Sequence, residues 1–409
     1  MSRMLVDSGI KWIGFLPNTW SITTVNKLFY RRKEVNDSKD PTILSLARDG
    51  VKIRDISTNE GQLAESYDNY HKVYKGDLLV NPMDLISGAN CSLSEVEGVI
   101  SPAYINLAKK TDIYPKYYDY FFKYQYWIKA MFIHGKGVSF DNRWTINWET
   151  MASYKVPFPK YDEQKRIADY LDKKCSKIDE IIKDNNKEIN LLNEYKKSLI
   201  ESELKKIKAC SIEGQIKHFV KYESGGILKN ILDSGNCKYI KMVNIDNYGN
   251  IDLNNLNYVD ADIKEINKFK VEKNDLLVNV RNSFELVGKF GIITEDIKNC
   301  IYNHMIVKYS LKNISALYLK YYMLSKRFQE QLKLVKRGTT NVAAVYKDDF
   351  MKLKIMVPHK NIQKSIESKI NDTWLIIDKV IEYRKQIIEK LEEYKKSLIY
   401  ECITGKREV

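Results

Sequence analysis

The stretch LNEYKKSLI, residues 192–200, recurs near the end of the chain as LEEYKKSLI, residues 391–399. The two copies are 199 residues apart, and the same offset carried backwards without a gap matches Pro159 with Pro358. It also matches Ile178-Asp179 with Ile377-Asp378. A repeat this long predicts a fold built from two copies of one unit, and that prediction outranks any single motif.

Residues 161–206, which contain the first copy, are predicted to form one long helix. They include neither proline nor glycine, and their apolar residues follow a heptad, which is typical of a coiled coil. At ~1.5 Å per residue such a helix is on the order of 65 Å long. Residues 360–402 repeat the pattern. The two heptad positions are Leu171, Ile178, Leu192 and Leu199 with Cys175, Ile182 and Ile189 in the first helix, and Ile370, Ile377, Leu391 and Leu398 with Trp374, Ile381 and Ile388 in the second.

The segments that precede the two helices are predicted to be globular. Turn residues separate short β-like runs, and the run Asp77-Leu78-Leu79-Val80-Asn81 returns as Asp275-Leu276-Leu277-Val278-Asn279. Prolines at the end of each segment cannot lie inside the helix that follows. We therefore divide the chain into two globular domains and two helical repeats: 1–160, 161–206, 207–358 and 359–409.

The predicted fold class is α+β, with two mixed α/β domains separated by two long helices. Each helix alone would expose its apolar stripe, so the two are expected to pair as an antiparallel coiled coil with a pseudo-twofold axis. Asn185 and Arg384 interrupt the same heptad position and are equivalent by the 199-residue offset. They either set the register of the pair or lie at a solvated edge. Lys196, Lys197, Lys395 and Lys396 are expected near helix C-termini, where they would complement the helix dipole.

The chain has a formal net charge of +14 and a pI near 9.1. The excess is +4 over residues 1–160 and +7 over 209–358, but only +1 over 161–208 and +2 over 359–409. A basic excess in the globular segments points to a polyanion such as nucleic acid, although general solubility explains it equally well.

Several protein classes do not fit the sequence. No apolar run approaches the ~18 residues that span a bilayer, and the start lacks the apolar core of a signal peptide. We therefore expect a cytoplasmic protein without a membrane partner. The six cysteines are scattered and include no C-x-x-C pair, which argues against a disulfide framework or a zinc site.

Catalytic motifs are weak or absent. The string Asn81-Pro82-Met83-Asp84 lacks the second proline and the aromatic residue of an amino-methyltransferase motif, and there is no Walker loop. Glu163-Gln164-Lys165 has the form of a nuclease E-x-K string, but it lies at a helix start, where it is interpreted as helix-start charge. His304 is expected in a core strand, and Asp77 and Asp275 are explained by turn chemistry. The sequence favours a binding protein over an enzyme.

Three stretches together resemble a known family. They are residues 7–20, Pro157-Phe158-Pro159 followed by Glu163-Gln164-Lys165-Arg166-Ile167, and the two Tyr-Lys-Lys-Ser-Leu-Ile stretches, the second of which runs into Thr404-Gly405-Lys406. Their order and duplication are similar to the specificity subunits of Type I restriction-modification systems. The resemblance covers essentially the whole chain.

That resemblance implies a DNA-reading subunit without catalysis or cofactor of its own. Residues 1–160 and 207–358 would be target-recognition domains, each reading one half of a bipartite site in double-stranded DNA. The helical repeats would set the distance between the half-sites and dock two modification subunits, which carry S-adenosylmethionine and methylate adenine. Restriction subunits, which use ATP and Mg²⁺ to cleave DNA, are a further partner that the resemblance allows.

Charged loops supply the candidate DNA-binding residues, because Arg and Lys contact phosphates and Arg, Asn and Gln read bases. Each of them is alternatively an ordinary solvated side chain. A different class of function also stays open, namely a coiled-coil assembly protein that binds nucleic acid without sequence preference, or binds protein. The candidates are Arg31, Arg32, Lys33, Arg48, Lys52, Arg54, Lys136 and Arg143 in the first domain, and Arg281, Asn282, Lys336, Arg337, Thr339 and Thr340 in the second.

Overall fold

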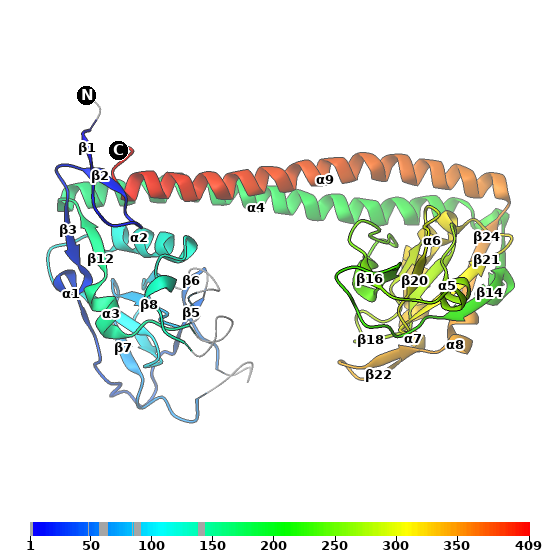
Figure 1. Cartoon of the computed structure of the whole chain (residues 1–409), viewed down its shortest axis with the longest axis horizontal. Helices are drawn as coiled ribbons and strands as arrows, with labels where there is room; N and C mark the ends of the chain where they lie inside the picture. The colour runs from blue at the N-terminus through cyan, green and yellow to red at the C-terminus, as the bar shows by residue number, and fades with distance from the viewer. Residues whose placement is uncertain (1–2, 48, 57–63, 84, 86–90, 138–143) are drawn as a thin grey trace. The chain divides into compact units, whose positions relative to one another are not determined.

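The computed structural model describes residues 3–47, 49–56, 64–83, 85, 91–137 and 144–409. The chain forms two compact units, and each contains one globular domain and one half of each long helix (Figure 1). Unit 1 comprises Met1–Asn185 with Lys385–Val409, and unit 2 comprises Asn186–Arg384.

Both predicted long helices are present, α4 at Tyr161–Lys206 and α9 at Lys360–Ile403. In unit 2, Glu203 pairs with Lys369 at 2.7 Å and Lys196 pairs with Asp378. Residue numbers fall on α4 as they rise on α9, so the two halves run antiparallel.

The halves in unit 1 run antiparallel as well. Asp179 pairs with Lys395 at 2.6 Å, and Arg3 bridges Glu163 at the start of α4 to Glu408 beyond the end of α9. The pair Asp179–Lys395 is the 199-residue repeat of Asp378–Lys196, so the internal repeat extends to individual ion pairs.

The predicted heptad positions form the contact between the helices, and we call them the seam. Seam residues that are buried in unit 1 are Leu171, Cys175, Ile178 and Leu398, and those in unit 2 are Ile370, Trp374, Ile377 and Ile381. The expectation that Lys196, Lys197, Lys395 and Lys396 lie near helix C-termini is wrong, because the basic residues in the last turn of α4 are Lys205 and Lys206 and the last turn of α9 contains none. Lys196 is 2% exposed and occupies the seam position seven residues after Ile189, ten residues before α4 ends. The heptad pattern places Lys196 at a seam position, where side chains face the partner helix, and this placement outweighs helix-end chemistry at this residue.

Asn185 and Arg384, which interrupt the seam, each have a polar partner in their own unit. Asn185 is 8% exposed and its Nδ2 donates to the carbonyl oxygen of Ile181 at 2.8 Å. Arg384 is half-buried and pairs with Glu188. Both contacts satisfy a polar group at an otherwise apolar position, and the shared role in register stays a prediction.

The globular domains contain equivalent antiparallel sheets. The order is β4-β11-β8-β9 in unit 1 and β14-β21-β17-β19 in unit 2. The duplicated strings at 77–81 and 275–279 become the central strands β8 and β17, which pair in the same way with their neighbours. The strands are β4 (Phe29–Arg31), β11 (Ile105–Lys109), β8 (Leu78–Val80), β9 (Cys91–Leu93), β14 (Val220–Gly225), β21 (Ile306–Leu311), β17 (Leu276–Asn279) and β19 (Phe290–Ile292).

The strand that leads into each long helix is also repeated. In unit 1, β12 (Lys155–Phe158) pairs with β3 (Ser21–Thr24), and in unit 2, β24 (Lys354–Pro358) pairs with β13 (Ser211–Gln215). The remaining elements of unit 1 are β1 (Leu5–Asp7), β2 (Phe15–Pro17), α1 (Val25–Leu28), β5 (Leu44–Ala47), β6 (Gly50–Ile53), β7 (His71–Val73), β10 (Gly98–Ile100), α2 (Pro115–Trp127), η1 (Phe132–His134) and α3 (Trp148–Ser153). Those of unit 2 are η2 (Lys208–Cys210), η3 (Ile216–Phe219), β15 (Cys237–Ile240), η4 (Met242–Asn244), β16 (Asn257–Val259), α5 (Ile263–Phe269), β18 (Arg281–Asn282), β20 (Cys300–Tyr302), α6 (Ala316–Leu324), α7 (Lys326–Val335), β22 (Lys336–Gly338), β23 (Ala343–Val345) and α8 (Lys347–Met351).

An aromatic helix joins each sheet to the helix pair. In unit 1, Tyr117, Tyr118 and Phe121 of α2 are at most 1% exposed, and the hydroxyl of Tyr120 donates to Asp172 on α4 at 2.6 Å. In unit 2, Tyr321 of α6 packs edge-on against Trp374 of α9, with ring centres 5.3 Å apart. Burial of such rings supplies much of the apolar stabilisation of each unit.

A buried glutamine fixes each of these aromatic helices to the start of a long helix. Gln164 is 0% exposed, accepts from the backbone N–H of Tyr114 and donates to the carbonyl oxygen of Pro159, both at 2.8 Å. Gln363 repeats both bonds, accepting from Ser315 at 3.0 Å and donating to Pro358 at 2.8 Å. Within the E-x-K string the middle residue is therefore a structural clamp.

Its neighbour Glu163 also makes contacts that stabilise the fold. It accepts a hydrogen bond from the indole N–H of Trp20 at 2.9 Å and pairs with Arg3. The interpretation of this string as helix-start structure fits these contacts.

Replacing either clamp should weaken its own unit. Gln164→Leu leaves the N–H of Tyr114 and the carbonyl of Pro159 buried without a partner, which costs about 2–4 kcal/mol for the two groups. Hydrogen exchange followed by mass spectrometry should show faster exchange at the start of α2 for Gln164→Leu, and at the start of α6 for Gln363→Leu. The control is the exposed neighbour, Lys165→Ala, which should change neither. Equal effects of Gln164→Leu and Lys165→Ala would contradict the clamp.

Candidate nucleic-acid interface

Four of the predicted DNA-binding residues of the second domain lie on one small sheet in unit 2, ordered β18-β23-β22. Arg281 on β18 and Arg337 on β22 both pair with Ala344 of the central strand. Side chains of directly paired residues point to the same face of a sheet. The two arginines therefore flank Ala344 on one face, about 10 Å apart because neighbouring strands are ~4.8 Å apart.

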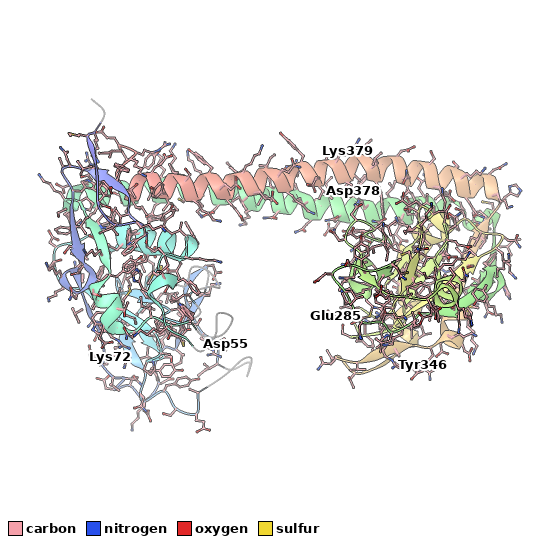
Figure 2. All side chains as sticks on the ribbon, in the orientation of Figure 1. Asp55, Lys72, Glu285, Tyr346, Asp378 and Lys379 are labelled. Carbon is pink, nitrogen blue, oxygen red and sulfur yellow. The ribbon has the colours of Figure 1, made fainter. Side chains whose placement is uncertain are left out.

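The exposed face of this sheet and the two residues that follow β23 form a cationic surface. We call it the basic face, and its residues are Arg281, Arg337, Tyr346 and Lys347. Both arginines are exposed, and the guanidinium of Arg337 lies 5.6 Å from the centre of the Tyr346 ring, a residue labelled in Figure 2. Arg337 also pairs with Asp349 at 2.7 Å, and Lys347 pairs with Glu223. A cavity of about 340 Å³ adjoins Arg281 and Tyr346.

The opposite face of the sheet is packed against the rest of unit 2. Nζ of Lys336 donates to the carbonyl oxygen of Phe284 at 3.0 Å, and burial lowers the pKa of this lysine. Nδ2 of Asn282 lies 3.6 Å from Sδ of Met242. Thr339 and Thr340 are exposed in the turn between β22 and β23. The sheet thus divides the predicted residues into an outward pair of arginines, an exposed turn and two packed side chains.

In the first domain, Arg32 is held by a buried carboxylate. Its Nε lies 2.9 Å from Oδ2 of Asp77, and its side chain is 18% exposed. Asp77 is 4% exposed and also accepts from Nδ2 of Asn106 and the backbone N–H of Tyr74, at 3.1 and 3.0 Å. This contact positions the end of β4 on the sheet. It also occupies the guanidinium group of Arg32, which was predicted to bind DNA.

Unit 2 repeats this buried carboxylate with different partners. Asp275 is 4% exposed, accepts from the backbone N–H of Glu272 at 2.9 Å and from the hydroxyl of Ser310 at 2.7 Å, and lies 3.5 Å from Nζ of Lys308. The turn chemistry predicted for Asp77 and Asp275 is confirmed by their bonds to backbone N–H groups. The buried cation beside each of them was not visible in the sequence, because its partner is distant in the chain.

Arg31 and Lys33 flank Arg32 and act on a common neighbour, His71 of β7. Burial and the positive charges of Arg31 and Lys33 together lower the pKa of His71. Arg31 and Lys33 thus place two positive charges close to His71 at the end of β4.

The other candidates of the first domain lie on separate segments. Lys52 is exposed on β6 and pairs with Asp49, and Arg54 directly follows that strand. Lys136 is exposed in a bridge with Thr145, whose carbonyl oxygen accepts from the Lys136 N–H at 2.7 Å. Arg48 and Arg143 lie outside the described residues.

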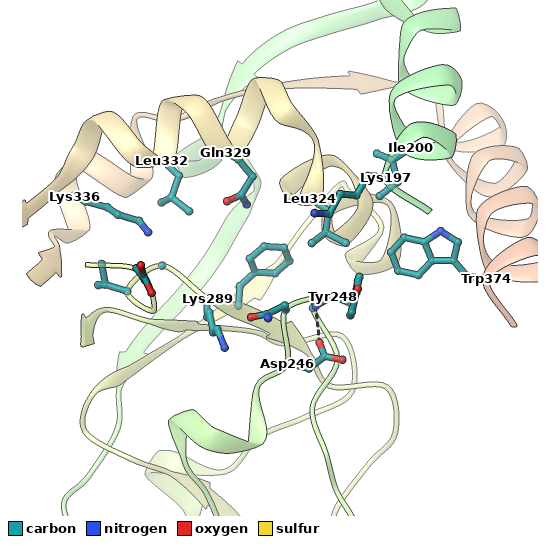
Figure 3. Close-up of a pocket in the computed structure, with 16 residues that line it drawn as sticks. Lys197, Ile200, Asp246, Tyr248, Lys289, Leu324, Gln329, Leu332, Lys336 and Trp374 are labelled. Carbon is teal, nitrogen blue, oxygen red and sulfur yellow. Dashed lines mark hydrogen bonds between the residues drawn. The ribbon is translucent and has the colours of Figure 1, made fainter. Parts of the chain in front are cut away.

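In unit 2 the globular domain meets the helix pair at a pocket of about 270 Å³ (Figure 3). Its walls include Tyr248 from a tight loop, Trp374 from α9 and Lys197 from α4. Gly249 has a φ of +75° and a side chain there would lie 2.9 Å from the Phe290 ring, so only glycine lets the loop approach this closely.

The same loop reaches the seam. The hydroxyl of Tyr248 donates to Asn193 of α4 at 2.7 Å. Nζ of the buried Lys196 lies 5.0 Å from the centre of the Tyr248 ring and 4.8 Å from that of Trp374, besides its ion pair with Asp378. A buried ammonium ion is tolerated when it is paired and surrounded by aromatic faces. These contacts fix the domain to its half of the helix pair.

The described residues contain no group of three His, Cys, Asp or Glu side chains arranged to hold a metal ion. Among the same residues, no helix combines the length and apolar character of a membrane span.

The prediction that His304 lies in the core is wrong. It is exposed and lines the cavity beside Arg281, because the chain turns at 303–305 before β21 begins. Sequence reasoning missed Tyr346 and Lys347 of the basic face and His304, which lines the adjoining cavity.

Comparison with known proteins explains the duplicated architecture. Residues 95–191 and 213–393 match the family model described as the Type I restriction modification DNA specificity domain. The matched residues make up more than half of the chain. The chain belongs to this family of DNA specificity proteins.

Individual relatives of the chain are specificity subunits of Type I restriction enzymes. The MjaVIII specificity subunit of a Type I restriction enzyme from Methanocaldococcus jannaschii is 25% identical over 373 residues, which cover 83% of this chain and 82% of the relative. The EcoBI specificity subunit from Escherichia coli is 23% identical over 343 residues, which cover 72% and 67%. A solved Type I restriction-modification structure matches 96% of this chain and 99% of its own, with a TM-score of 0.64 and 11% identity, and supports the fold. The chain is thus a specificity subunit of a Type I restriction-modification complex.

The contrast between Arg32 and Arg281 can be tested by stability. Arg32→Ala leaves the Asp77 carboxylate buried without its cation and should destabilise the chain by about 3 kcal/mol. Arg281→Ala removes an exposed side chain and should change stability by less than about 0.5 kcal/mol. Urea unfolding followed by circular dichroism measures both. An Arg32→Ala variant as stable as the wild type would contradict this structural role of Arg32.

Proposed function

We propose that this specificity subunit binds a DNA target in two parts, one contacted by each globular domain, and carries no catalytic residues of its own. The basic face of unit 2 is the observation that carries the proposal. Its outward arginines are set about 10 Å apart on the exposed face of a small three-stranded sheet, a spacing comparable with the ~12 Å width of the DNA major groove. Arg is also the side chain that most often reads guanine there.

Within this surface the residues would have different tasks. Arg281 and Arg337 are suited to base edges or to phosphates on either side of the groove, and Thr339 and Thr340 project from the turn beside them. Lys336 and Asn282 attach the packed face of the small sheet to the rest of the domain. In unit 1, Arg31, Lys33, Lys52, Arg54 and Lys136 remain candidates, and Arg32 serves the fold.

The same proposal covers partners and cofactors. Two modification subunits would dock on the helix pair, one for each repeated half, and they would supply S-adenosylmethionine and methylate adenine. Restriction subunits would bring ATP and Mg²⁺. The subunit would act in the cytoplasm, where the DNA of the cell is accessible to it.

Methylation mapping tests the function in the cell. A genome from cells that carry this chain and its modification subunit should contain one split motif methylated in both parts, and deletion of the chain should abolish that methylation. A coiled-coil protein that binds DNA without sequence preference would leave no such motif, and that outcome would overturn the proposal.

The basic face has its own test. The double variant Arg281→Ala/Arg337→Ala should reduce affinity for the target at least tenfold, lower the dependence of affinity on salt, and relax specificity in one part of the motif only. Binding is measured by fluorescence anisotropy with the assembled complex at several salt concentrations. The matched control is Lys326→Ala/Lys333→Ala, which removes two exposed charges from α7 of the same unit and should retain the motif. An unchanged motif and affinity in the arginine variant would exclude this face from recognition.

A further inference from the structure

The helix pair of unit 2 exposes a strip of large apolar side chains. We call it the apolar strip: Leu191 and Tyr195 on α4, and Ile376, Val380 and Tyr383 on α9. Their exposed fractions are 53%, 53%, 65%, 37% and 65%. Soluble proteins rarely leave such side chains clustered in water without a use for them.

All five residues lie on one side of the helix pair. Each directly precedes a seam position, for example Tyr195 before Lys196 and Ile376 before Ile377. Consecutive residues are rotated by about 100° around a helix, so a residue before the seam points to one side of the pair. In an antiparallel pair that side is the same for both helices.

Residues that directly follow the seam point to the other side, toward the globular domain. Asn193 follows Leu192 and accepts the hydrogen bond from Tyr248, and Lys197 follows Lys196 and lines the pocket of Figure 3. The apolar strip therefore lies on the side of the pair that the domain leaves uncovered.

The size of the strip suits a helical partner. Tyr side chains carry ~150–250 Å² each and the aliphatic side chains carry less, so the exposed part of the five residues is on the order of 500 Å². One side of a stable protein interface buries roughly 800 Å². Two antiparallel helices with a free apolar strip cover it by accepting further helices, as in a four-helix bundle.

The repeated half of unit 1 has a smaller strip that charged residues interrupt. The 199-residue offset matches Ile376 with Lys177, Tyr383 with Asp184 and Leu191 with Lys390. Only Val380 and Tyr195 retain apolar counterparts, Ile181 and Tyr394, which are 46% and 49% exposed. Tyr170 and Ile387 add half-buried apolar residues on that side, where unit 2 has Lys369 and Glu188.

We infer that the two docking faces for the modification subunits are unequal, and that the first modification subunit binds through its helices to the apolar strip of unit 2. This inference rests on the proposed function. The mixed, charged face of unit 1 binds the second modification subunit more weakly, since charged side chains must be desolvated there. A complex of one specificity and one modification subunit therefore accumulates before the complete assembly.

Native mass spectrometry during a titration with the modification subunit tests the order. The wild-type chain should form a 1:1 complex at concentrations at least tenfold lower than the 2:1 complex. Ile376→Lys/Tyr383→Asp gives unit 2 the residues of unit 1, and should weaken the first step about tenfold or more and bring the two steps together. These side chains are 65% exposed, so folding is preserved, which circular dichroism checks.

The reverse exchange is the matched variant. Lys177→Ile/Asp184→Tyr gives unit 1 the residues of unit 2 and should strengthen the second step. Two equal steps in the wild type, an unchanged first step in Ile376→Lys/Tyr383→Asp, or a homodimer of this chain formed through the strip would each overturn the inference. Failure of any modification subunit to bind would instead overturn the proposed function.

Discussion

The buried glutamine at the start of each long helix is the contact on which the arrangement of each unit depends. Gln164 and Gln363 each bridge a proline carbonyl before the long helix and the first N–H of the aromatic helix of the domain. The N–H group at the start of the aromatic helix has no intrahelical partner, and the proline carbonyl lies before the long helix begins and takes no part in its hydrogen bonds. One amide side chain satisfies both because it is donor and acceptor at once. The domain is thereby attached to its helix by groups whose separation would cost free energy.

The repeat preserves this attachment while the surfaces around it differ. The four-stranded sheets, the buried Asp77 and Asp275 and the ion pairs Asp179–Lys395 and Lys196–Asp378 have equivalents in both units. The partners of the carboxylates differ, however, and Cys175 occupies the seam position of Trp374. A duplicated scaffold with divergent surfaces is what a protein needs if its two halves are to contact different sequences, because specificity depends on side chains at the surface.

Sequence reasoning predicted the features that depend on local pattern and on duplication. The heptads predicted α4 and α9, and the family resemblance rested on stretches whose helix-entry glutamines the structure places as clamps. Sequence reasoning could not distinguish Arg32 from Arg281. Arg32 is neutralised by Asp77, 45 residues away in the chain, and Arg281 is exposed on the strand that pairs with Ala344. His304 and Lys196 were misplaced for the same reason. Local context suggested a strand and a helix end, whereas tertiary contacts decided their burial.

Lys196 shows how the seam combines specificity with cost. An ammonium ion at a seam position is expensive to bury, and a hydrophobic residue would stabilise the pair more. Its ion pair with Asp378 and its contacts with Tyr248 and Trp374 are available only when α4, α9 and the loop of the domain are correctly aligned. A slipped helix register would leave the charge buried without these partners. The lysine therefore penalises wrong registers more than it stabilises the correct one, and a subunit that holds DNA-reading surfaces in place needs that discrimination.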